Sequence, residues 1–471
     1  MKILFANPPI YDNEKRFNRP IRFPSFSYAS DVLHPPILLA YVTSFIRANG
    51  HEVKFLDAPA LRLNLDSFLN DVKKFNPDYT VFETSTVSFK SDAKVVADIK
   101  KLTECKTVFV GPHVSAMPKE SLEQSSLDAV VMGEYEYPLL DLIQKGPNKN
   151  IQGIAYRKNN NGNSEIIVNE KQIPPTNLDD MPFPARDLMP NSKYFDPILK
   201  NPFTYIVSGR GCPFRCTFCN WPQVLWGHEY RTRSSQNVVK EIQDIENNYD
   251  FKSFLFNDDT FTVDKPHAMS VSEEMIKQKT NIDWACYTRA DMADEELLKT
   301  LRKAGCFLLK CGVESGNQEV LNLMKKGNKI NKIKEGIKKM KDNGFHVHAT
   351  FIFGMPGETE KSIQQTIDFS KELDPTTVQF STAIPYPKTE FYQYLEDKGY
   401  LDNKNWEDSL PMQPTYQYPE LSKDDLKTAV KKAYRSYYFR GKYVKIGVNG
   451  LFTEPFRFMS NFYSLLKLVY K

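Results

Sequence analysis

Short apolar runs alternate with helix-like segments over the first 145 residues of the chain, and this alternation sets the fold class. The runs lie near residues 2–6, 52–57, 79–83, 107–111 and 128–132. The clearest helical pattern spans residues 37–49, where apolar side chains recur on one stripe, and Gly50 follows as a helix stop. Because strands separated by helices form parallel sheets, we predict an α/β domain with a five-stranded parallel sheet covered on both faces.

A second alternating series fills the middle of the chain. Its strand candidates are residues 203–208, 253–257, 284–288, 308–313, 346–353 and 376–381. A helical pattern follows each of them, which predicts six βα units in a partial or full barrel. Residues 146–195, between the two series, hold a predicted hairpin and a Pro-rich run, so we place a linker there. The domains are then residues 1–145, the barrel at 196–400 and a helical C-terminal cap at 401–471.

Three cysteines stand within eight residues on the loop that follows the first predicted barrel strand. They are Cys212, Cys216 and Cys219. Three thiolates on one loop can hold one inorganic core, and a set of three leaves one metal position open for a substrate or cofactor. Two alternatives are free buried thiols and a zinc ion with His228 as its fourth ligand. The remaining cysteines are typical of packed interiors and are Cys105, Cys286, Cys306 and Cys311.

Polar and glycine-containing loops follow the strands of the N-terminal series. They read Asn7-Pro8-Pro9, Thr84-Ser85-Thr86, Gly111-Pro112-His113 and Gly133-Glu134. Ligands of open α/β sheets bind outside the carboxyl ends of the strands. A single loop of this kind is more often an ordinary turn, but four of them on one edge favour a ligand site.

The spacing Cys-x3-Cys-x2-Cys after the first strand of a βα barrel resembles the signature of the radical S-adenosylmethionine (SAM) superfamily. Motifs at later strand ends resemble it too, namely Asn257-Asp258-Asp259-Thr260-Phe261, Arg289, Gly312-Val313-Glu314-Ser315-Gly316 and Phe353-Gly354-Met355-Pro356-Gly357-Glu358. The resemblance implies a partial TIM barrel with a [4Fe–4S] cluster on Cys212, Cys216 and Cys219, which are then the catalytic residues. The SAM-binding residues that it implies are Phe218, Asp258, Arg289, Glu314, Ser315 and Gly354.

Side-chain chemistry agrees with these implied roles. Glu314 can accept hydrogen bonds from ribose hydroxyls, and Arg289 can form a charge-assisted pair with the carboxylate of SAM. Gly354 and Gly357 allow the backbone to approach the adenine closely.

The first 145 residues resemble the cobalamin-binding domain that precedes the barrel in the B12-dependent branch of this superfamily. The matching stretches are Asn7-Pro8-Pro9, His34-Pro35-Pro36, Gly111-Pro112-His113 and Met132-Gly133-Glu134. This implies a flavodoxin-like (Rossmann-like) domain whose cobalamin-binding residues are Asn7, Pro8, Pro9, Thr84, Ser85, Gly111, His113, Gly133 and Glu134. The motif Asp-x-His-x-x-Gly, whose histidine coordinates cobalt in many cobalamin proteins, is absent from the sequence. We therefore assign no protein ligand to cobalt and expect His113 to be a neighbour of the corrin.

The resemblance implies a cobalamin-dependent radical SAM enzyme. It would methylate an unactivated carbon of a small-molecule, lipid or peptide substrate by way of a 5′-deoxyadenosyl radical and methylcobalamin, with a donor such as flavodoxin or ferredoxin supplying electrons. The same cofactors could instead support a radical cyclisation or rearrangement. A non-catalytic cobalamin sensor is disfavoured because it has no use for the three-cysteine loop. A methylthiotransferase would need further N-terminal cysteines, and only Cys105 precedes Cys212.

Charge and hydropathy exclude other classes of protein. A net charge of +4 over 471 residues is close to neutral and argues against a protein built to bind nucleic acid. No long apolar window and no signal peptide are found, so we expect a cytoplasmic protein. Residues 427–445 carry seven basic residues and no acidic ones, interleaved with aromatic residues. We predict a helix of the cap there, and the alternative is peripheral membrane contact.

Overall fold

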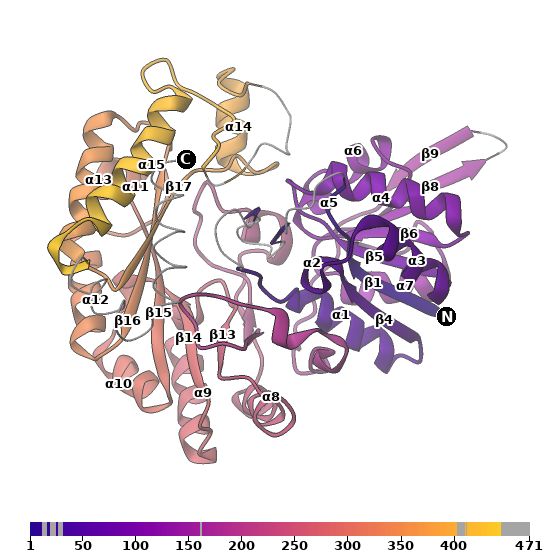
Figure 1. Cartoon of the computed structure of the whole chain (residues 1–471), viewed down its shortest axis with the longest axis horizontal. Coiled ribbons are helices and arrows are strands. Elements are labelled where there is room, and N and C mark those ends of the chain that lie inside the picture. The colour runs from indigo at the N-terminus through magenta and orange to yellow at the C-terminus, as the bar shows by residue number, and fades with distance from the viewer. Residues whose placement is uncertain are drawn as a thin grey trace.

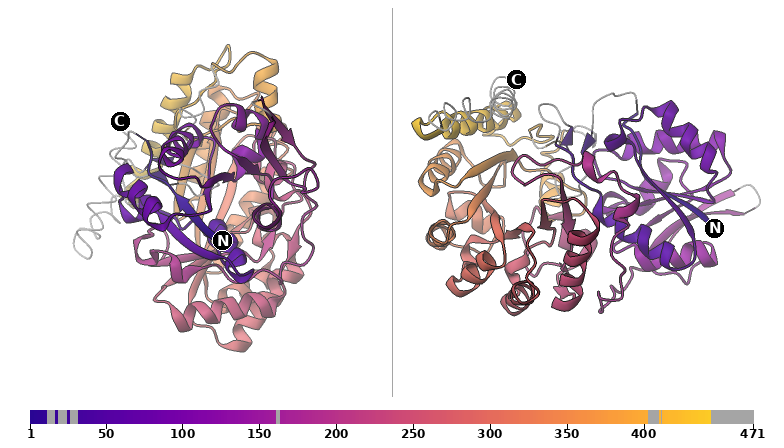
Figure 2. Two further views of the ribbon diagram at one scale, coloured as in Figure 1. Left: turned by 90° about the vertical axis from the view of Figure 1, so that its right-hand side faces the viewer. Right: turned by 60° about the horizontal axis from the view of Figure 1, so that its bottom comes forward.

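The computed structural model describes residues 1–11, 17–18, 25–26, 32–160, 163–402, 410 and 412–443. These residues form two α/β units that lie side by side (Figure 1). The N-terminal unit contains elements β1 to β9, and the barrel unit contains elements β10 to α15. The right-hand view of Figure 2 shows the same two units after rotation.

A seven-stranded sheet forms the middle of the N-terminal unit. Its strands, in spatial order, are β4 (Glu52–Asp57), β1 (Lys2–Asn7), β5 (Tyr79–Glu83), β6 (Lys106–Val110), β7 (Ala129–Val131), β8 (Ile154–Asn160) and β9 (Asn163–Val168). The first five strands are parallel, as the alternation of the sequence predicts. The last two run antiparallel, β8 to β7 and β9 to β8.

The hairpin of β8 and β9 corrects one prediction. We placed it in the linker of residues 146–195, but it extends the sheet beyond β7. Pairing of Val131 with Ile154 gives the edge of β7 partners for its backbone groups, which an isolated hairpin would leave open. The linker proper therefore starts after β9 and holds two short 3-10 turns, at Arg186–Leu188 and Asn191–Lys193.

Helices cover both faces of the first sheet. α1 (Ile37–Ala48) and α7 (Glu136–Lys145) pack on one face, and α3 (Leu65–Phe75) and α4 (Phe89–Leu102) pack on the other. The helix predicted at 37–49 is confirmed by α1, and Gly50 has a φ of +84°, a conformation that favours glycine after a helix. The remaining elements of this unit are short: β2 (Phe17–Asn18), β3 (Ser25–Phe26), α2 (Ala58–Leu61), α5 (Pro112–Ala116) and α6 (Pro118–Glu123).

Six parallel strands form the sheet of the barrel unit. They lie in chain order: β10 (Phe203–Ile206), β13 (Ser253–Phe256), β14 (Asp283–Thr288), β15 (Cys306–Glu314), β16 (His346–Phe353) and β17 (Thr377–Thr382). β10 and β17 are the two ends of this order, so the barrel is partial, as predicted. The main outer helices are α8 (Ser235–Asn248), α9 (Lys265–Gln278), α10 (Glu295–Lys303), α12 (Ile330–Asp342) and α13 (Glu360–Leu373).

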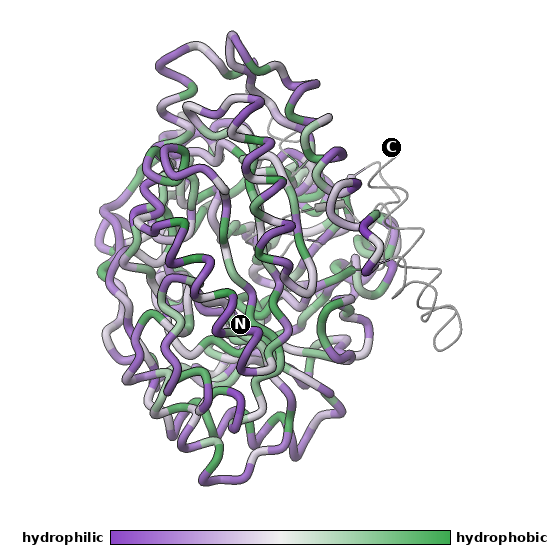
Figure 3. Tube along the Cα trace, turned by 90° about the vertical axis from the view of Figure 1, so that its left-hand side faces the viewer, coloured by the Kyte–Doolittle hydropathy of each residue, from purple (hydrophilic) through white to green (hydrophobic). Residues whose placement is uncertain are grey.

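Shorter elements sit at the carboxyl ends of the barrel strands. They are β11 (Gly209–Arg210), the π-helical turn Trp221–Trp226, β12 (Arg231–Thr232), the 3-10 turns Phe261–Val263 and Ala290–Met292, α11 (Gln318–Leu323) and α14 (Glu390–Asp397). In Figure 3 apolar segments run through the interior of the molecule, and polar segments are common on the outer helices.

The predicted cap is confirmed in its described part. α15 (Lys423–Tyr438) packs against β17, and its residues Tyr434 and Tyr437 are buried. The hydroxyl of Tyr434 accepts a hydrogen bond from the backbone N–H of Phe380 at 3.1 Å. The apolar segment after residue 443, on which the membrane alternative depends, lies outside the described residues. Within the described part of the chain, no helix is long and apolar enough to cross a bilayer.

A buried ion network joins α8 to the linker and to α1. The carboxylate of Glu241 pairs with Arg186 at 2.6 Å and with Arg233, and the hydroxyl of Tyr41 donates to it at 3.0 Å. The side chains of Glu241 and Arg186 are fully buried. Burial alone would raise the pKa of Glu241, but the two guanidinium groups outweigh it and hold the pKa below its ordinary value. Glu241 therefore stays ionised between the two units.

We expect Glu241→Ala to lower the free energy of unfolding by about 3–5 kcal/mol, because it leaves two buried guanidinium groups without their carboxylate. Urea denaturation of the full chain measures this loss. Glu335→Ala is the control, since Glu335 lies in an exposed ion pair on α12 and its loss should leave the stability close to that of the wild type. Equal losses in the two variants would show that the buried network does not hold the units together.

Candidate active site

The three cysteines lie on the loop between β11 and the turn Trp221–Trp226, at the carboxyl end of the first barrel strand. Gly211 opens this loop at a φ of +95°. A side chain at this position would clash with the backbone oxygen of Glu229. Glycine is therefore required directly before Cys212.

Hydrogen bonds hold the backbone of the loop in place. Nε2 of Gln223 donates to the backbone oxygens of Cys216 and Cys219 at 3.1 and 2.6 Å. Nδ1 of His228 lies 3.0 Å from the backbone oxygen of Cys212, so this imidazole contacts the loop backbone. Among the residues that the structure describes, no group of three His, Cys, Asp or Glu side chains is already arranged to hold a metal ion.

The thiols lie in a buried environment that disfavours free thiolates. Burial, together with the nearby Asp259 and Cys216, raises the pKa of Cys212 to about 11. Burial and Asp259 also raise the pKa of Cys219. Thiolates in such a place need a positive partner, and a bound metal core supplies one and deprotonates the thiols that hold it. The chemistry of the loop therefore fits an iron–sulfur cluster.

Arg289 lies against the cysteine loop. Its guanidinium group stacks over the ring of Phe214 at 3.8 Å from the centroid and donates to the backbone oxygen of Lys326 at 2.9 Å. It also forms a two-pronged pair with Asp291 at 3.1 and 2.9 Å. Arg289 is thus beside the cysteines, as expected, and contact with the carboxylate of SAM remains a prediction for it.

Glu314 ends β15 with a φ of +70°, which is strained for a residue other than glycine. Its carboxylate accepts hydrogen bonds from Nζ of Lys326 at 2.9 Å and from Oγ1 of Thr350 at 3.3 Å. Burial opposes the charge of Lys326, but Glu314 and Cys216 outweigh it and raise the pKa of the ammonium group. Lys326 was not predicted, and it connects the cysteine loop with the end of β15.

Three other predicted SAM residues are built into the barrel wall. Oγ of Ser315 lies 3.1 Å from Oγ1 of Thr366, which ties this strand end to α13. Phe218 is partly buried and packs against the barrel core. Gly354 has a φ of +87°, and a side chain there would clash with the hydroxyl of Tyr416. Only glycine, which has no side chain, leaves room for the Tyr416 hydroxyl at the turn after β16.

Asp258 is buried and has partners within the protein. Its carboxylate accepts from the backbone N–H and hydroxyl of Ser208 at 2.8 and 2.6 Å and from the hydroxyl of Tyr230 at 3.0 Å. Asp258 therefore ties the loops after β10 and β13 together. The carboxylate that helps to raise the pKa of Cys212 belongs to Asp259, the residue after Asp258. Asp259 was not among the predicted site residues.

Buried polar atoms without hydrogen-bond partners occur at the carboxyl edge of the N-terminal sheet. They are Oδ1 of Asn7, at the end of β1, and Nδ1 of His113, on the short helix after β6. Burial lowers the pKa of His113 to about 3, so its imidazole is neutral. Buried Pro8 and Pro9 follow Asn7, and Gly133, two residues after β7, has a φ of +72°. Unsatisfied buried groups cost free energy unless a ligand meets them, which fits an amide-rich cofactor such as cobalamin.

The neighbouring strand end carries an ordered hydroxyl network. Oγ1 of Thr84 donates to Asp92 at 2.8 Å, and Ser88 does the same at 2.8 Å. Oγ of Ser85 lies 3.0 Å from that of Ser88. A side chain at Gly111, whose φ is +110°, would come within 2.6 Å of the backbone oxygen of Thr84. The edge is therefore closely packed and fixed in shape.

Glu134 connects the two units. It is buried and pairs with two arginines of the barrel unit, Arg210 at 2.8 Å and Arg231. Glu136 holds the other edge of the Arg210 guanidinium at 2.6 Å. A carboxylate between two guanidinium groups is already satisfied, so Glu134 contributes to the contact between the units, and a contact with cobalamin remains a prediction for it. We call Glu134, Glu136, Arg210 and Arg231 the interdomain clamp.

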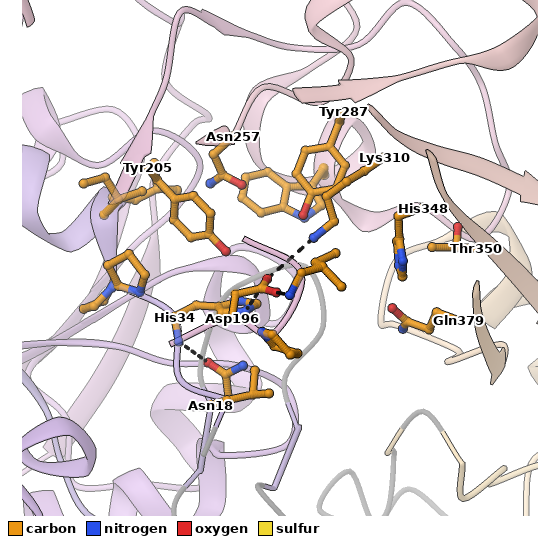
Figure 4. A pocket seen from close by; sticks show the side chains of 18 of the residues that line it. Asn18, His34, Asp196, Tyr205, Asn257, Tyr287, Lys310, His348, Thr350 and Gln379 are labelled. Carbon is orange, nitrogen blue, oxygen red and sulfur yellow. Dashed lines mark hydrogen bonds and ion pairs between the residues drawn. The ribbon is translucent and has the colours of Figure 1, made fainter. Parts of the chain in front are cut away.

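A cavity of about 250 Å³ lies between the two units (Figure 4). The N-terminal unit contributes His34–Leu38 and Glu83 to its wall, and the linker contributes Asp196–Ile198. Trp221, two residues after Cys219, also lines it. The barrel contributes polar side chains from its inner face, which are Tyr205, Asn257, Tyr287, Lys310, His348, Thr350 and Gln379.

Family models match the two units separately. Residues 29–143 match the model of the B12 binding domain, and residues 206–370 match the model of the radical SAM superfamily. An uncharacterized methyltransferase of Pyrococcus horikoshii is 32% identical over 452 residues, which cover 94% of this chain and 93% of the relative. The chain belongs to the B12-binding radical SAM family.

Other relatives of this enzyme carry methyltransferase names. The cytidylyl-2-hydroxyethylphosphonate methyltransferase of Streptomyces wedmorensis is 30% identical and covers 78% of the enzyme and 79% of the relative. The solved structure of the radical SAM methyltransferase TsrM from Kitasatospora setae, with cobalamin and a [4Fe–4S] cluster bound, has a TM-score of 0.67 at 19% identity. The superposition covers 84% of this chain and 75% of the TsrM chain. This similarity confirms the predicted fold. The cofactors of the enzyme are the cluster, SAM and cobalamin, as the two matched domains require.

The polar cavity residues of the enzyme were missed at the level of sequence, although a signal for them exists. β16 begins His346-Val347-His348-Ala349-Thr350, with a polar side chain at every second position. Parallel strands that are buried on both faces are usually continuously apolar. A polar residue at period two therefore marks a strand face that lines a polar interior.

Glu358 should make the stability of the enzyme depend on pH. Its buried carboxyl group accepts from the backbone N–H groups of Gly354 and Met355, and burial raises its pKa to about 8. The ordinary pKa of about 4.3 applies in the unfolded chain. Between about pH 4 and 8 the folded protein therefore holds a proton on Glu358 that the unfolded chain has lost. The stabilisation of the fold by this protonated carboxyl group is complete below about pH 4 and is lost as the pH rises through 8.

We expect Glu358→Gln, which cannot ionise, to remove this dependence. Between pH 5 and 8 the free energy of unfolding should fall less steeply in the variant than in the wild type, by roughly 1.4 kcal/mol per pH unit. Urea denaturation at several pH values gives both slopes. Glu360→Gln, at the exposed start of α13, should follow the wild type. Parallel curves for wild type and Glu358→Gln would contradict the raised pKa.

Proposed function

We propose that this enzyme transfers a methyl group from cobalamin to a carbon atom of a small molecule, at the cavity between its two units. The observation that carries this proposal is the composition of the cavity wall. Glu83 belongs to the strand end that adjoins the predicted cobalamin edge, whereas Trp221 directly follows the cysteine loop. A molecule in this cavity therefore lies between the two candidate cofactor sites.

The chain itself holds, orients and encloses the reactants. When bound, the cluster and SAM supply a radical, and cobalamin supplies the methyl group. Cys212, Cys216 and Cys219 are the cluster ligands. The interdomain clamp fixes Arg210, two residues before Cys212, to the end of β7. The N-terminal unit lies over the open side of the partial barrel, which keeps water away from a reactive intermediate.

Relatives support a small-molecule substrate. The Streptomyces wedmorensis relative is named as a methyltransferase of cytidylyl-2-hydroxyethylphosphonate, which is a small polar compound. The structure of TsrM has also been solved with a tryptophan substrate. Reduction of the cluster requires an external one-electron donor, and flavodoxin or ferredoxin is the class that we expect.

Cys216→Ala should abolish cluster assembly, because a [4Fe–4S] core needs all three protein thiolates of the loop. The anaerobically purified wild type should contain about four iron atoms per chain, and the variant should contain almost none and form no 5′-deoxyadenosine from SAM. Iron analysis and product chromatography measure both. Cys105→Ala, in the core of the N-terminal unit, should keep its iron. A wild-type protein with one zinc and no iron would refute the cluster.

The full-length protein should retain cobalamin through gel filtration after reconstitution with hydroxocobalamin. Because no Asp-x-His-x-x-Gly histidine is present, its spectrum should be that of a base-off species. The spectrum of His113→Ala should be the same, since we place His113 beside the corrin without ligation. A spectral change in this variant would make His113 a ligand. Failure of the wild type to retain cobalamin would refute the methyl-transfer proposal.

A further inference from the structure

The segment that joins β17 to α14 is fixed to the cysteine loop. The backbone N–H of Phe391, in α14, donates to the backbone oxygen of Thr217 at 3.0 Å. The backbone N–H of Glu390 donates to Oε1 of Gln223 at 3.1 Å. Gln223 is also the side chain whose Nε2 donates to backbone oxygens of the cysteine loop. The end of the last barrel strand and the loop after the first strand therefore meet at this place.

Tyr386 belongs to this segment and is buried. Its residue is 8% exposed, and its hydroxyl oxygen is shielded from solvent. The backbone oxygen of Tyr386 accepts from the backbone N–H and the hydroxyl of Thr389 at 3.2 and 2.7 Å, which fixes the turn that carries the ring. Burial and the nearby Cys219 raise the pKa of Tyr386 above its ordinary value of about 10. The phenol is therefore protonated, and it can donate a hydrogen bond close to Cys219.

The hydroxyl of Tyr386 has no hydrogen-bond partner in the described part of the chain. The same holds for the buried hydroxyl of Thr217, which stands between Cys216 and Cys219. Burial of a hydroxyl without a partner is unfavourable, and a redox or catalytic role is one of the reasons for which native proteins retain such a group. Two of these hydroxyls beside one loop point to an acceptor that binds at the loop.

The cofactor of the loop supplies acceptors of this kind. The sulfur atoms of an iron–sulfur cluster accept hydrogen bonds, and these hydrogen bonds are one of the factors that set its reduction potential. A cluster that takes up an electron gains negative charge. Because a hydrogen bond to a negatively charged acceptor is stronger, a donor beside the cluster stabilises the reduced form more than the oxidised form.

We propose that Tyr386 donates a hydrogen bond to the sulfur of Cys219 when the cluster is bound, and that it thereby raises the reduction potential of the cluster. The inference rests on the proposed role of Cys219 as a cluster ligand and is independent of the methyl acceptor. In the step concerned, one electron passes from the external flavodoxin- or ferredoxin-type donor to the cluster. No covalent bond forms or breaks, and the proton stays on the oxygen of Tyr386. Tyr386 thus acts through the cluster.

A redox titration of the holoenzyme tests this role. The reduced cluster is counted from its electron paramagnetic resonance signal, which is distinct from that of Co(II) in cobalamin. At one fixed potential, the ratio of reduced to oxidised cluster should be about tenfold lower in Tyr386→Phe than in the wild type. For a one-electron couple this is a shift of about 59 mV to lower potential. Tyr394→Phe, which removes the hydroxyl of an exposed tyrosine on α14, is the matched control and should titrate as the wild type.

Iron analysis accompanies the titration. Tyr386→Phe should hold as much iron as the wild type, because the hydroxyl is not a ligand. An intact cluster with an unchanged potential overturns the proposal. A wild type that binds no cluster is a different failure, since it refutes the cysteine ligands and this inference together.

A second variant keeps the hydroxyl and decides the case in which Tyr386→Phe loses its iron. Replacement of Tyr386 by 3-fluorotyrosine leaves the shape of the ring almost unchanged and makes its hydroxyl a stronger donor. The reduction potential should then rise above that of the wild type, opposite to the shift in Tyr386→Phe. A potential that is unchanged or lower in the fluorinated protein overturns the proposal.

Two further measurements separate a hydrogen bond to the cluster from other roles of Tyr386. The titration is repeated without SAM, and the difference between wild type and Tyr386→Phe should persist. A difference that occurs only with SAM would show that the hydroxyl binds SAM and would overturn the proposal. Formation of 5′-deoxyadenosine by Tyr386→Phe should be slow with reduced flavodoxin and recover with titanium(III) citrate, which is a stronger reductant. A loss that titanium(III) does not restore would indicate a structural role and would also overturn it.

Discussion

The arrangement of this enzyme depends on carboxylates and guanidinium groups that are buried together between its two units. Glu134 and Glu136 bind Arg210 and Arg231 in the interdomain clamp, and Glu241 binds Arg186 and Arg233 beneath it. Ions in such places are stable only when they are paired, because removal from water costs each of them several kcal/mol. Separation of the units would leave the charges of the clamp unpaired, because its two glutamates belong to the N-terminal unit and its two arginines to the barrel unit. The cavity between them consequently has a defined shape and polarity.

The clamp also relates the two candidate cofactor sites to each other. Glu134 follows the last parallel strand of the first sheet, and Arg210 stands two residues before Cys212. An ion pair therefore links a strand end of the cobalamin-binding unit to the start of the cluster loop. In radical chemistry the reacting groups must be held in a productive geometry, and a rigid link of this kind fixes the distance between them.

Local patterns predicted those parts of the site in which a residue acts through its own chemistry or backbone. The three cysteines follow the first barrel strand, the glycines Gly354 and Gly357 have positive φ angles after β16, and the helix expected at 37–49 is present. Patterns failed where the partner of a residue comes from far along the chain. The pairing of Glu134 with Arg210 and Arg231, which lie 76 and 97 residues further along the chain, was not predicted. The hairpin at residues 154–168 likewise seemed part of a linker until its pairing with β7 was known.

The sequence by itself determined the two α/β units and the six barrel strands, because periodicity is local and needs no partner. Its motifs also carried the resemblance to the family, which implies the three cysteines as the cluster ligands. It also placed the loops of the cobalamin-binding unit at one sheet edge, since carboxyl ends of parallel strands meet there. Only the tertiary structure decided which charges face each other. The pairing of Lys310 with Asp196, the neutral state of His348 and the pairing of Glu134 with Arg210 all depend on burial and on contacts between segments far apart in the chain. Electrostatic energies are set by distance and dielectric environment, and both exist only after the chain has folded.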